Sequence, residues 1–134
     1  MNRRSYFSIM LASMAGMAGI KRASAQKAAR PIVLNCDLAV DPAKEQEMLR
    51  NYRTIFKPAA EKFPGYIDLK MLKLRSALQG SAPASINYRF QLTYESEELR
   101  QKWIHSDIHQ KVWPTIENTL TNKSNYPVLL FDSV

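Results

Sequence analysis

Both histidines and both tryptophans of the chain lie within one short stretch near its C-terminal end. The segment from Trp103 to His109 reads Trp-Ile-His-Ser-Asp-Ile-His, and Trp113 follows four residues later. A neutral imidazole accepts a proton near physiological pH, and an indole ring offers a flat apolar surface. The stretch therefore predicts a proton acceptor beside an aromatic wall.

These residues also have structural explanations. Trp103 and Trp113 fall at helical spacing, which is typical of core packing. His105 and His109 are four residues apart and share a helix face, where a solvated histidine pair is common. The pair lacks further ligands nearby, so no metal site is predicted.

The sequence around this stretch predicts four strands and two helical regions. Strict alternation of apolar and polar residues is the signature of a strand with one buried face. Two segments show it clearly, and two others are rich in apolar residues and bounded by turn signals. The expected strands cover residues 31–40, 66–75, 85–95 and 126–131.

The first helical region follows the first strand. Asp41 supplies an N-cap and Pro42 stands at the first helical position. Pro58 is expected to kink or split this helix because it lacks an N–H group, and Pro64-Gly65 ends it. The expected core positions are Met48, Tyr52, Ile55, Ala59 and Phe63.

The second helical region begins at Ser96, which is an expected N-cap. Ser106-Asp107 predicts a restart of the helix, and Pro114 predicts another break. The link over 76–84, between the second and third strands, is expected to be mobile. The expected core positions of the helix are Leu99, Trp103, Ile108, Val112, Ile116 and Leu120.

The order strand, helix, strand, strand, helix, strand predicts an α+β fold. We expect a ferredoxin-like sandwich in which two helices cover one face of an antiparallel four-stranded sheet. The other sheet face keeps apolar side chains that a lone domain would leave in water. The sequence therefore predicts a homodimer formed through this sheet face.

Residues 1–25 have the pattern of an export leader. Arg3-Arg4 precedes an apolar run over residues 6–20, and Lys21-Arg22 precedes Ala23-Ser24-Ala25. This pattern predicts a twin-arginine signal peptide, export to a periplasmic or extracytoplasmic location, and one domain over residues 26–134. The apolar run is shorter than the roughly 20 residues of a membrane span, so no stable span is expected after cleavage.

The charge distribution excludes one class of partner. Four of the 19 Lys and Arg residues lie in the leader and none of the 12 acids does, so the formal charge falls from +7 to +3 without it. The remaining charges are interspersed, and no nucleic-acid footprint is visible. Cys36 is the single cysteine. It is either a buried structural thiol or half of an intermolecular bridge.

Three motifs carry a resemblance to a known family. They are Pro64-Gly65-Tyr66 at the start of the second strand, the run from Phe90 to Ser96, and Trp103 followed by Ser106-Asp107 and His109. Over residues 26–134 the sequence resembles the antibiotic biosynthesis monooxygenase family, whose members are dimeric α/β-barrel proteins. The resemblance implies a pocket between sheet and helices in each subunit.

The resemblance also implies a chemistry that needs no metal or flavin. In members that oxidise phenolic polyketides, the enzyme helps to deprotonate the substrate, whose carbanion then donates an electron to oxygen. Such a site needs a base, a donor for the developing oxyanion and a dry apolar wall. The candidates are His109 or His105 as base, Asn35 or Arg89 as donor, and Trp103, Tyr88 and Trp113 as wall.

Two alternatives stay open. In the first, the protein is a non-catalytic dimeric module for small-molecule binding or assembly. In the second, it resembles the haem-degrading monooxygenases, whose strand-one asparagine and helix-two tryptophan match Asn35 and Trp103. Their iron-ligating histidine does not carry over, because Trp113 occupies its position. In addition, the alternation of the strand places the Asn35 side chain on the opposite sheet face from Cys36. No cofactor is therefore expected, with haem as the minor alternative.

Overall fold

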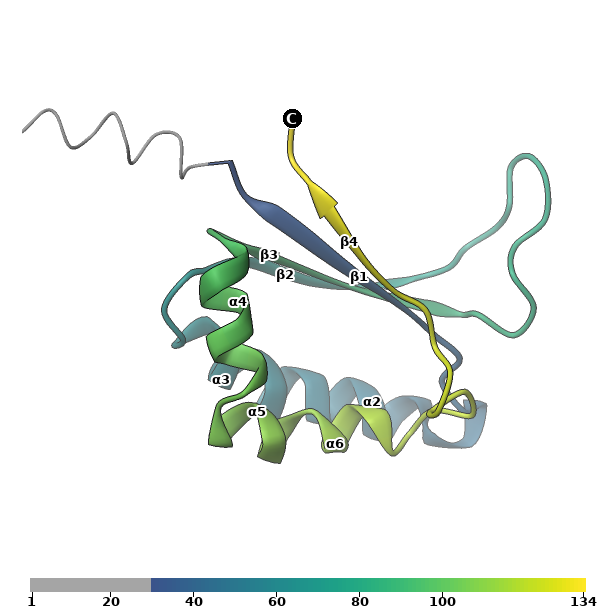
Figure 1. Ribbon diagram of the computed structural model, residues 1–134. Helices are drawn as coiled ribbons and strands as arrows, with labels where there is room; N and C mark the ends of the chain where they lie inside the picture. Colours follow the sequence, from purple (N-terminus) through teal and green to yellow (C-terminus); the bar gives the residue numbers. More distant parts are fainter. Residues whose placement is uncertain (1–29) are drawn as a thin grey trace, which may run out of the picture. The chain divides into compact units, whose positions relative to one another are not determined.

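The computed structural model describes residues 30–134, and the expected leader over 1–25 lies outside them. The chain forms four strands and two helical regions, and each helical region is broken into short helices (Figure 1). The strands are β1 (Ile32–Leu38), β2 (Tyr66–Lys73), β3 (Tyr88–Tyr94) and β4 (Val128–Asp132). The helices are η2 (Pro42–Lys44), α2 (Glu45–Asn51), η3 (Tyr52–Phe56), α3 (Lys57–Glu61), α4 (Glu97–Ile104), α5 (Asp107–Val112) and α6 (Pro114–Glu117).

The four strands form one antiparallel sheet in the order β2-β3-β1-β4. All helices lie on one side of this sheet, and β4 forms one edge (Figure 1). The predicted ferredoxin-like sandwich is confirmed. Among the described residues, no helix is long and apolar enough to cross a membrane.

The alternation of side chains along the strands separates an inner from an outer sheet face. On β1, Leu34 and Cys36 are buried against the helices, and their neighbours Asn35 and Asp37 point to the other side. On β3, Phe90 and Leu92 pair with these inner residues. The core therefore lies between the sheet and the helical layer.

The first helical region does not keep the expected register. The turn over η3 is a π-helix, in which the Lys57 N–H group bonds the Tyr52 carbonyl five residues earlier. Pro58 follows directly and has no N–H group to donate, so a widened turn is tolerated there. The extra residue in the turn rotates the helix, and Phe56 becomes fully buried. The prediction that Ile55 is a core residue was wrong: its side chain is 39% exposed.

The second helical region breaks where the sequence predicts. Ser96 caps α4 by accepting a bond from the Leu99 N–H group, and Ser106 caps α5 in the same way from His109. The break after Ile104 changes the helical phase. Because of this, His109 turns toward the core and Ile108 is exposed, so the prediction that Ile108 lies in the core was wrong.

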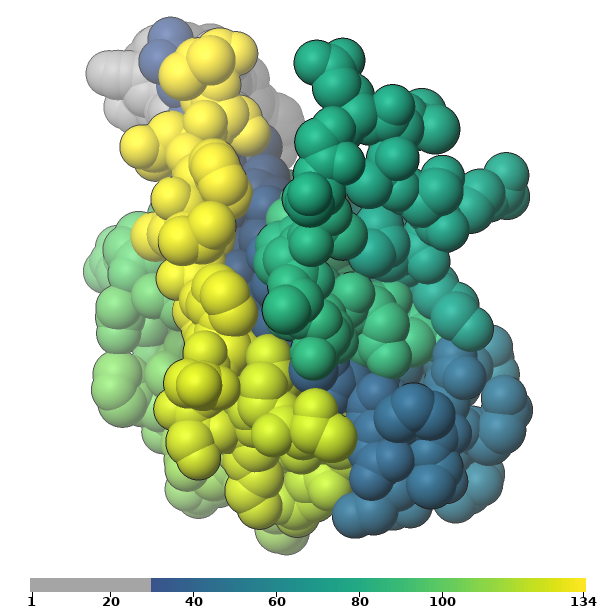
Figure 2. All heavy atoms as spheres, turned by 90° about the vertical axis from the view of Figure 1, so that its right-hand side faces the viewer, coloured from purple at the N-terminus to yellow at the C-terminus, as the bar shows by residue number. Residues whose placement is uncertain are grey.

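The link between β2 and β3 is longer than expected and covers residues 74–87. At its end the Asn87 side chain bonds both the N–H and the carbonyl of Val40, at 2.8 and 2.9 Å. The side-chain amide thus makes the two hydrogen bonds that a backbone peptide group of a neighbouring strand would make. The regular pairing of β3 with β1 begins at the next residue, Tyr88. Figure 2 shows the link (teal) and β4 (yellow) as two columns with β1 (dark blue) visible between them.

Candidate functional site

A cavity of about 190 Å³ lies between the sheet and the second helical region. Its floor consists of inner side chains of β1 and β3, and its walls come from the helices and from the segment that leads into β4. Most of the lining is apolar or aromatic. The lining residues are Leu34, Cys36, Phe56, Phe90, Leu92, Arg100, Trp103, Ile104, His109, Trp113, Tyr126 and Val128.

His109 lies among the aromatic rings of this cavity. Its ring centroid is 5.1 Å from that of Trp103, at a near-perpendicular angle, and 6.3 Å from that of Trp113, with the two planes nearly parallel. Its Nδ1 atom is buried and has no hydrogen-bond partner in the described part of the chain. Burial lowers the pKa of His109 to about 4, against a smaller opposing effect of Glu117. The imidazole is therefore neutral at neutral pH.

Trp113 and Tyr126 are fixed by a chain of hydrogen bonds at the cavity wall. The Trp113 Nε1–H group donates to the Tyr126 hydroxyl at 3.0 Å, and that hydroxyl donates to Glu117 Oε2 at 2.8 Å. Burial and the bond to Glu117 raise the pKa of Tyr126 to about 12. Both polar groups are therefore already satisfied and neutral, and they hold the wall in place.

Arg100 brings a positive charge to the cavity from α4. Its side chain is 15% exposed and makes a two-pronged ion pair with Glu97, with Nε and Nη2 at 2.7 and 2.9 Å from the carboxylate oxygens. Within residues 30–134, its Nη1 atom makes no hydrogen bond. The hydrogen bond to Glu97 is the main cause that raises the pKa of Arg100. The cavity thus combines an aromatic cage, a neutral imidazole and one cation.

Comparisons with solved structures locate this architecture among known folds. A candidate antibiotic biosynthesis monooxygenase from Caulobacter crescentus superposes with a TM-score of 0.61 at 17% identity, over 79% of this chain and 92% of that one. A second candidate, from Bordetella bronchiseptica, gives 0.62 at 13% identity, over 78% and 98%. The chain has the fold of these proteins.

A dimeric ferredoxin-like protein of unknown function from a Jannaschia species also shares this fold. It matches with a TM-score of 0.61 at 16% identity, over 76% of this chain and 96% of that one. No family model matches the sequence, and no curated protein matches it. At these identities the likeness shows the fold alone, so the roles of the site residues follow from the geometry of this chain.

The two histidines are not brought together. His105 is the C-cap residue of α4, its ring is exposed, and its Nδ1 atom lies 2.9 Å from the Gln101 carbonyl oxygen. The break between α4 and α5 removes the expected shared face. His109 is therefore the histidine of the cavity.

Tyr88 lies on the inner face but away from the cavity. It is 3% exposed, and its hydroxyl donates to Glu45 Oε2 at 2.6 Å. This bond ties the start of β3 to the start of α2. Trp103 and Trp113, the other two expected wall residues, both line the cavity.

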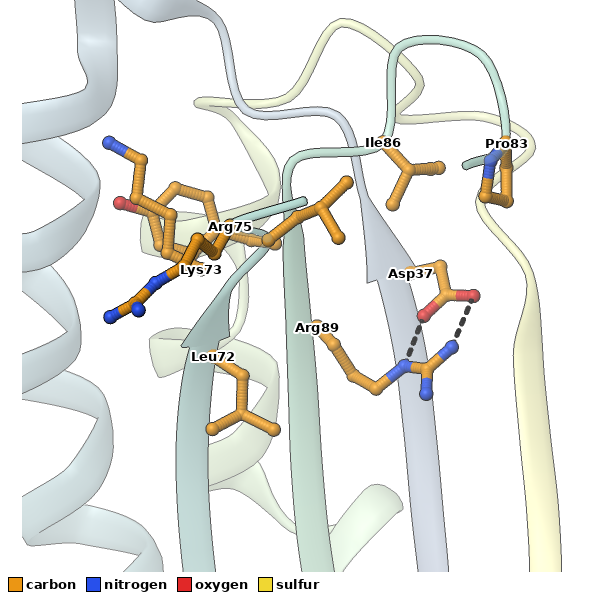
Figure 3. A pocket seen from close by; sticks show the side chains of 9 residues that line it. Asp37, Leu72, Lys73, Arg75, Pro83, Ile86 and Arg89 are labelled. Carbon is orange, nitrogen blue, oxygen red and sulfur yellow. Dashed lines mark hydrogen bonds and ion pairs between the residues drawn. The ribbon is translucent and has the colours of Figure 1, made fainter. Parts of the chain in front are cut away.

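Asn35 and Arg89, the two expected oxyanion donors, point to the outer sheet face. Asn35 accepts a bond from Gln91 at 3.1 Å, and Arg89 pairs with Asp37 at 2.7 and 3.2 Å. Figure 3 shows this ion pair among the side chains that line a separate pocket of about 320 Å³ at the base of the 74–87 link. The sheet separates both residues from His109, so neither reaches the cavity in one subunit.

Sequence reasoning missed several cavity residues. Phe56 reaches the cavity through the π-turn, which no periodicity predicts. Arg100 precedes Trp103 by three residues, so the two lie on the same side of α4. That spacing was the available signal for Arg100.

Cys36 is buried, as expected for a structural thiol, and burial raises the pKa of its thiol to about 12.

The cavity does not fit a haem. A haem has four pyrrole rings around its iron, whereas the cavity is only slightly larger than the 150 Å³ cavities known to hold one benzene ring. Among the described residues, no group of three His, Cys, Asp or Glu side chains is placed to hold a metal ion.

The buried imidazole predicts a pH dependence of stability. The unfolded chain takes up a proton on His109 below about pH 6.5, whereas the folded protein does so only near pH 4. Stability is therefore unaffected by this group above pH 6.5 and falls as the pH drops from 6.5 toward 4. We expect a loss on the order of 2 kcal/mol, measured by urea unfolding at pH 7.5 and pH 5.

The variant His109→Gln is expected to remove most of this loss. His105→Gln is the matched control, because His105 is exposed and contacts solvent in both states. An unchanged pH profile in His109→Gln would contradict the buried placement of the imidazole.

Proposed function

We propose that this protein is an exported, dimeric, monooxygenase-like protein that binds a small aromatic or quinonoid compound. The cavity lined by Phe56, Phe90, Trp103 and Trp113 around the unpartnered His109 ring carries the proposal. Four aromatic rings supply stacking and edge contacts to a flat ligand. The neutral imidazole can exchange one hydrogen bond with a ligand hydroxyl or carbonyl group.

The proposed reaction is a cofactor-independent oxidation by molecular oxygen. A phenol or quinol loses a hydroxyl proton to the base His109, and the resulting anion, which has carbanion character at a ring C–H carbon, transfers an electron to O₂. Recombination forms a C–O bond at that carbon, and loss of water leaves a C=O group. One phenol and one O₂ thus give one quinone and one water, with no other oxidant.

One observation favours the alternative of a binding module without turnover. A base works best when its pKa lies near the working pH. With a pKa of about 4, His109 is available as a proton acceptor but is a weak one. The binding proposal and the oxidation proposal therefore need separate measurements.

Tryptophan fluorescence and oxygen consumption provide these measurements. Both tryptophans of the chain line the cavity, so a bound quinol is expected to change most of the emission. Oxygen uptake with a panel of small quinols is expected in the wild type and is expected to fall at least tenfold in His109→Ala. Binding without oxygen uptake would support the module and remove the oxidation. The control His105→Ala is expected to match the wild type in both assays.

The homodimer is proposed to form through the outer sheet face. Leu129 and Phe131 of β4 lie on this face and are 49% and 48% exposed. Leu72 of β2 adds a third apolar side chain. Exposed apolar groups of this kind on a sheet are typical of an interface, and the Jannaschia protein of the same fold is dimeric.

Replacing Phe131 with aspartate is expected to weaken the dimer. Burial of a phenylalanine contributes about 1.5–3 kcal/mol, so the dissociation constant is expected to rise at least about tenfold. Analytical ultracentrifugation at micromolar concentration measures this. The control Ile108→Asp alters a side chain of similar exposure on the helical layer and is expected to leave the dimer intact. A monomeric wild type would contradict the proposal.

The export part of the proposal rests on the leader pattern of residues 1–25. Mass spectrometry of the protein recovered from the periplasm is expected to show a chain that begins at Gln26. An uncleaved chain in the cytoplasm would contradict it.

A further inference from the structure

The size of the cavity limits the ligand to one aromatic ring. Cavities of about 150 Å³ hold a benzene molecule, and pockets for drug-sized ligands begin at about 300 Å³. At about 190 Å³, this cavity accommodates a single ring with one or two small substituents. Ligands with fused rings, such as anthrones, are too large for it.

Two of the polar side chains in the cavity wall already make hydrogen bonds within the protein and are not available to a ligand. The Tyr126 hydroxyl and the Trp113 N–H group bond each other, and the hydroxyl also bonds Glu117. The Cys36 thiol, on the β1 side, stays neutral because burial raises its pKa to about 12. The polar groups that remain for a ligand are the neutral His109 ring and the Arg100 guanidinium.

The charge of Arg100 acts on the interior of the cavity. It lowers the pKa values of the Cys36 thiol and of His109, although burial dominates both shifts, and the opposing charges of Asp37 on Cys36 and of Glu117 on His109 act more strongly than Arg100. The carboxylate of its partner Glu97 is 44% exposed and lies outside the cavity lining. Glu117, the other acid near His109, is engaged by Tyr126. Among the described residues that line the cavity, Arg100 carries a positive charge and none is an Asp or Glu.

We propose that the cavity selects single-ring phenols and binds them as phenolates, with the anionic oxygen at Nη1 of Arg100 and the ring between Trp103 and Trp113. This inference rests on the proposed function, because it assigns the ligand class of the same cavity. The ion pair with Glu97 orients the guanidinium and leaves Nη1 for the ligand. A charge-assisted hydrogen bond is about twice as strong as a neutral one. Arg100 is thus a specificity residue of the cavity that His109 also lines.

The probe for this proposal is 4-nitrophenol, whose phenolate form absorbs visible light. In the presence of saturating wild-type protein, its apparent pKa is expected to fall by about one unit, which is a tenfold preference for the phenolate. The neutral ether 4-nitroanisole has a similar shape and is expected to bind at least tenfold more weakly than the phenolate. Equilibrium dialysis measures its affinity.

The variants Arg100→Gln and Arg100→Lys test the assigned residue. Arg100→Gln is expected to abolish the pKa shift of nitrophenol and to lower the affinity for nitrophenolate far more than the affinity for nitroanisole. Arg100→Lys is expected to keep part of the shift. Thermal unfolding checks that both variants are folded, and the comparison of the two ligands on the wild type needs no variant.

The outcomes separate the two proposals. Equal binding of nitrophenolate and nitroanisole, or an unchanged shift in Arg100→Gln, would overturn the assignment to Arg100 and leave the aromatic site standing. If neither compound binds the wild type, both this assignment and the proposed function are wrong.

Discussion

Replacement of Trp103 with alanine is expected to lower the free energy of unfolding by about 3–5 kcal/mol, the usual cost of removing a large buried aromatic side chain. Trp103 is 1% exposed and packs against Phe56, Phe63 and His109, with ring centroids 5.1–5.8 Å apart. Its removal leaves a cavity that the sheet and the helices cannot close. Urea denaturation at pH 7.5 measures the loss.

Leu78→Ala is the control for this change. Leu78 is 96% exposed on the link between β2 and β3, so its truncation is expected to change stability by less than about 0.5 kcal/mol. A loss in Trp103→Ala as small as that of Leu78→Ala would mean that the indole does not pack in the core. Trp103→Ala is also expected to lose affinity for aromatic ligands, because Trp103 lines the cavity.

The second large effect is expected at Gly65. Its φ angle is +96°, and a Cβ atom added there would lie 2.7 Å from the Leu99 Cβ atom. The left-handed backbone costs an L-residue about 1–2 kcal/mol, and overpacking adds about 1–3 kcal/mol. Gly65→Ala is therefore expected to destabilise the protein by about 3 kcal/mol in the same urea assay.

Gly80 provides a matched control. Its φ angle is +73°, and an added Cβ atom would meet nothing within 4 Å. Gly80→Ala therefore carries the backbone cost of about 1 kcal/mol without the steric one. Equal losses in the two variants would show that Leu99 moves aside and that the contact at Gly65 carries no energy.

Much of the fold could be predicted from local signals. Alternation on β1 and β3 identified both strands and the face that each buries, because the side-chain period of a strand is fixed at two. Ser96 and Ser106 identified the starts of α4 and α5, because their hydroxyl groups accept the free N–H groups of the first turn. The break before α5 was predicted as well, although its effect on His105 and Ile108 was not.

Part of the candidate site could be predicted in the same way. Trp103, His109 and Trp113 were found from residue type and spacing, and all three line the cavity. Asn35 and Arg89 were chosen for their chemistry, but the chemistry of a side chain says nothing of the sheet face that it occupies. The parity of β1 and its register with β3 place both on the outer face.

The sequence by itself determined the strands, the caps and the aromatic cluster, since each follows from interactions between residues close in the chain. The tertiary structure decided which side chains enter the cavity. Around Pro58 the chain forms a π-turn, and the widened turn exchanges Ile55 for Phe56 at the core because Phe56 then packs against Phe90 and Trp103. Those contacts join residues more than 30 positions apart, so no local pattern encodes them.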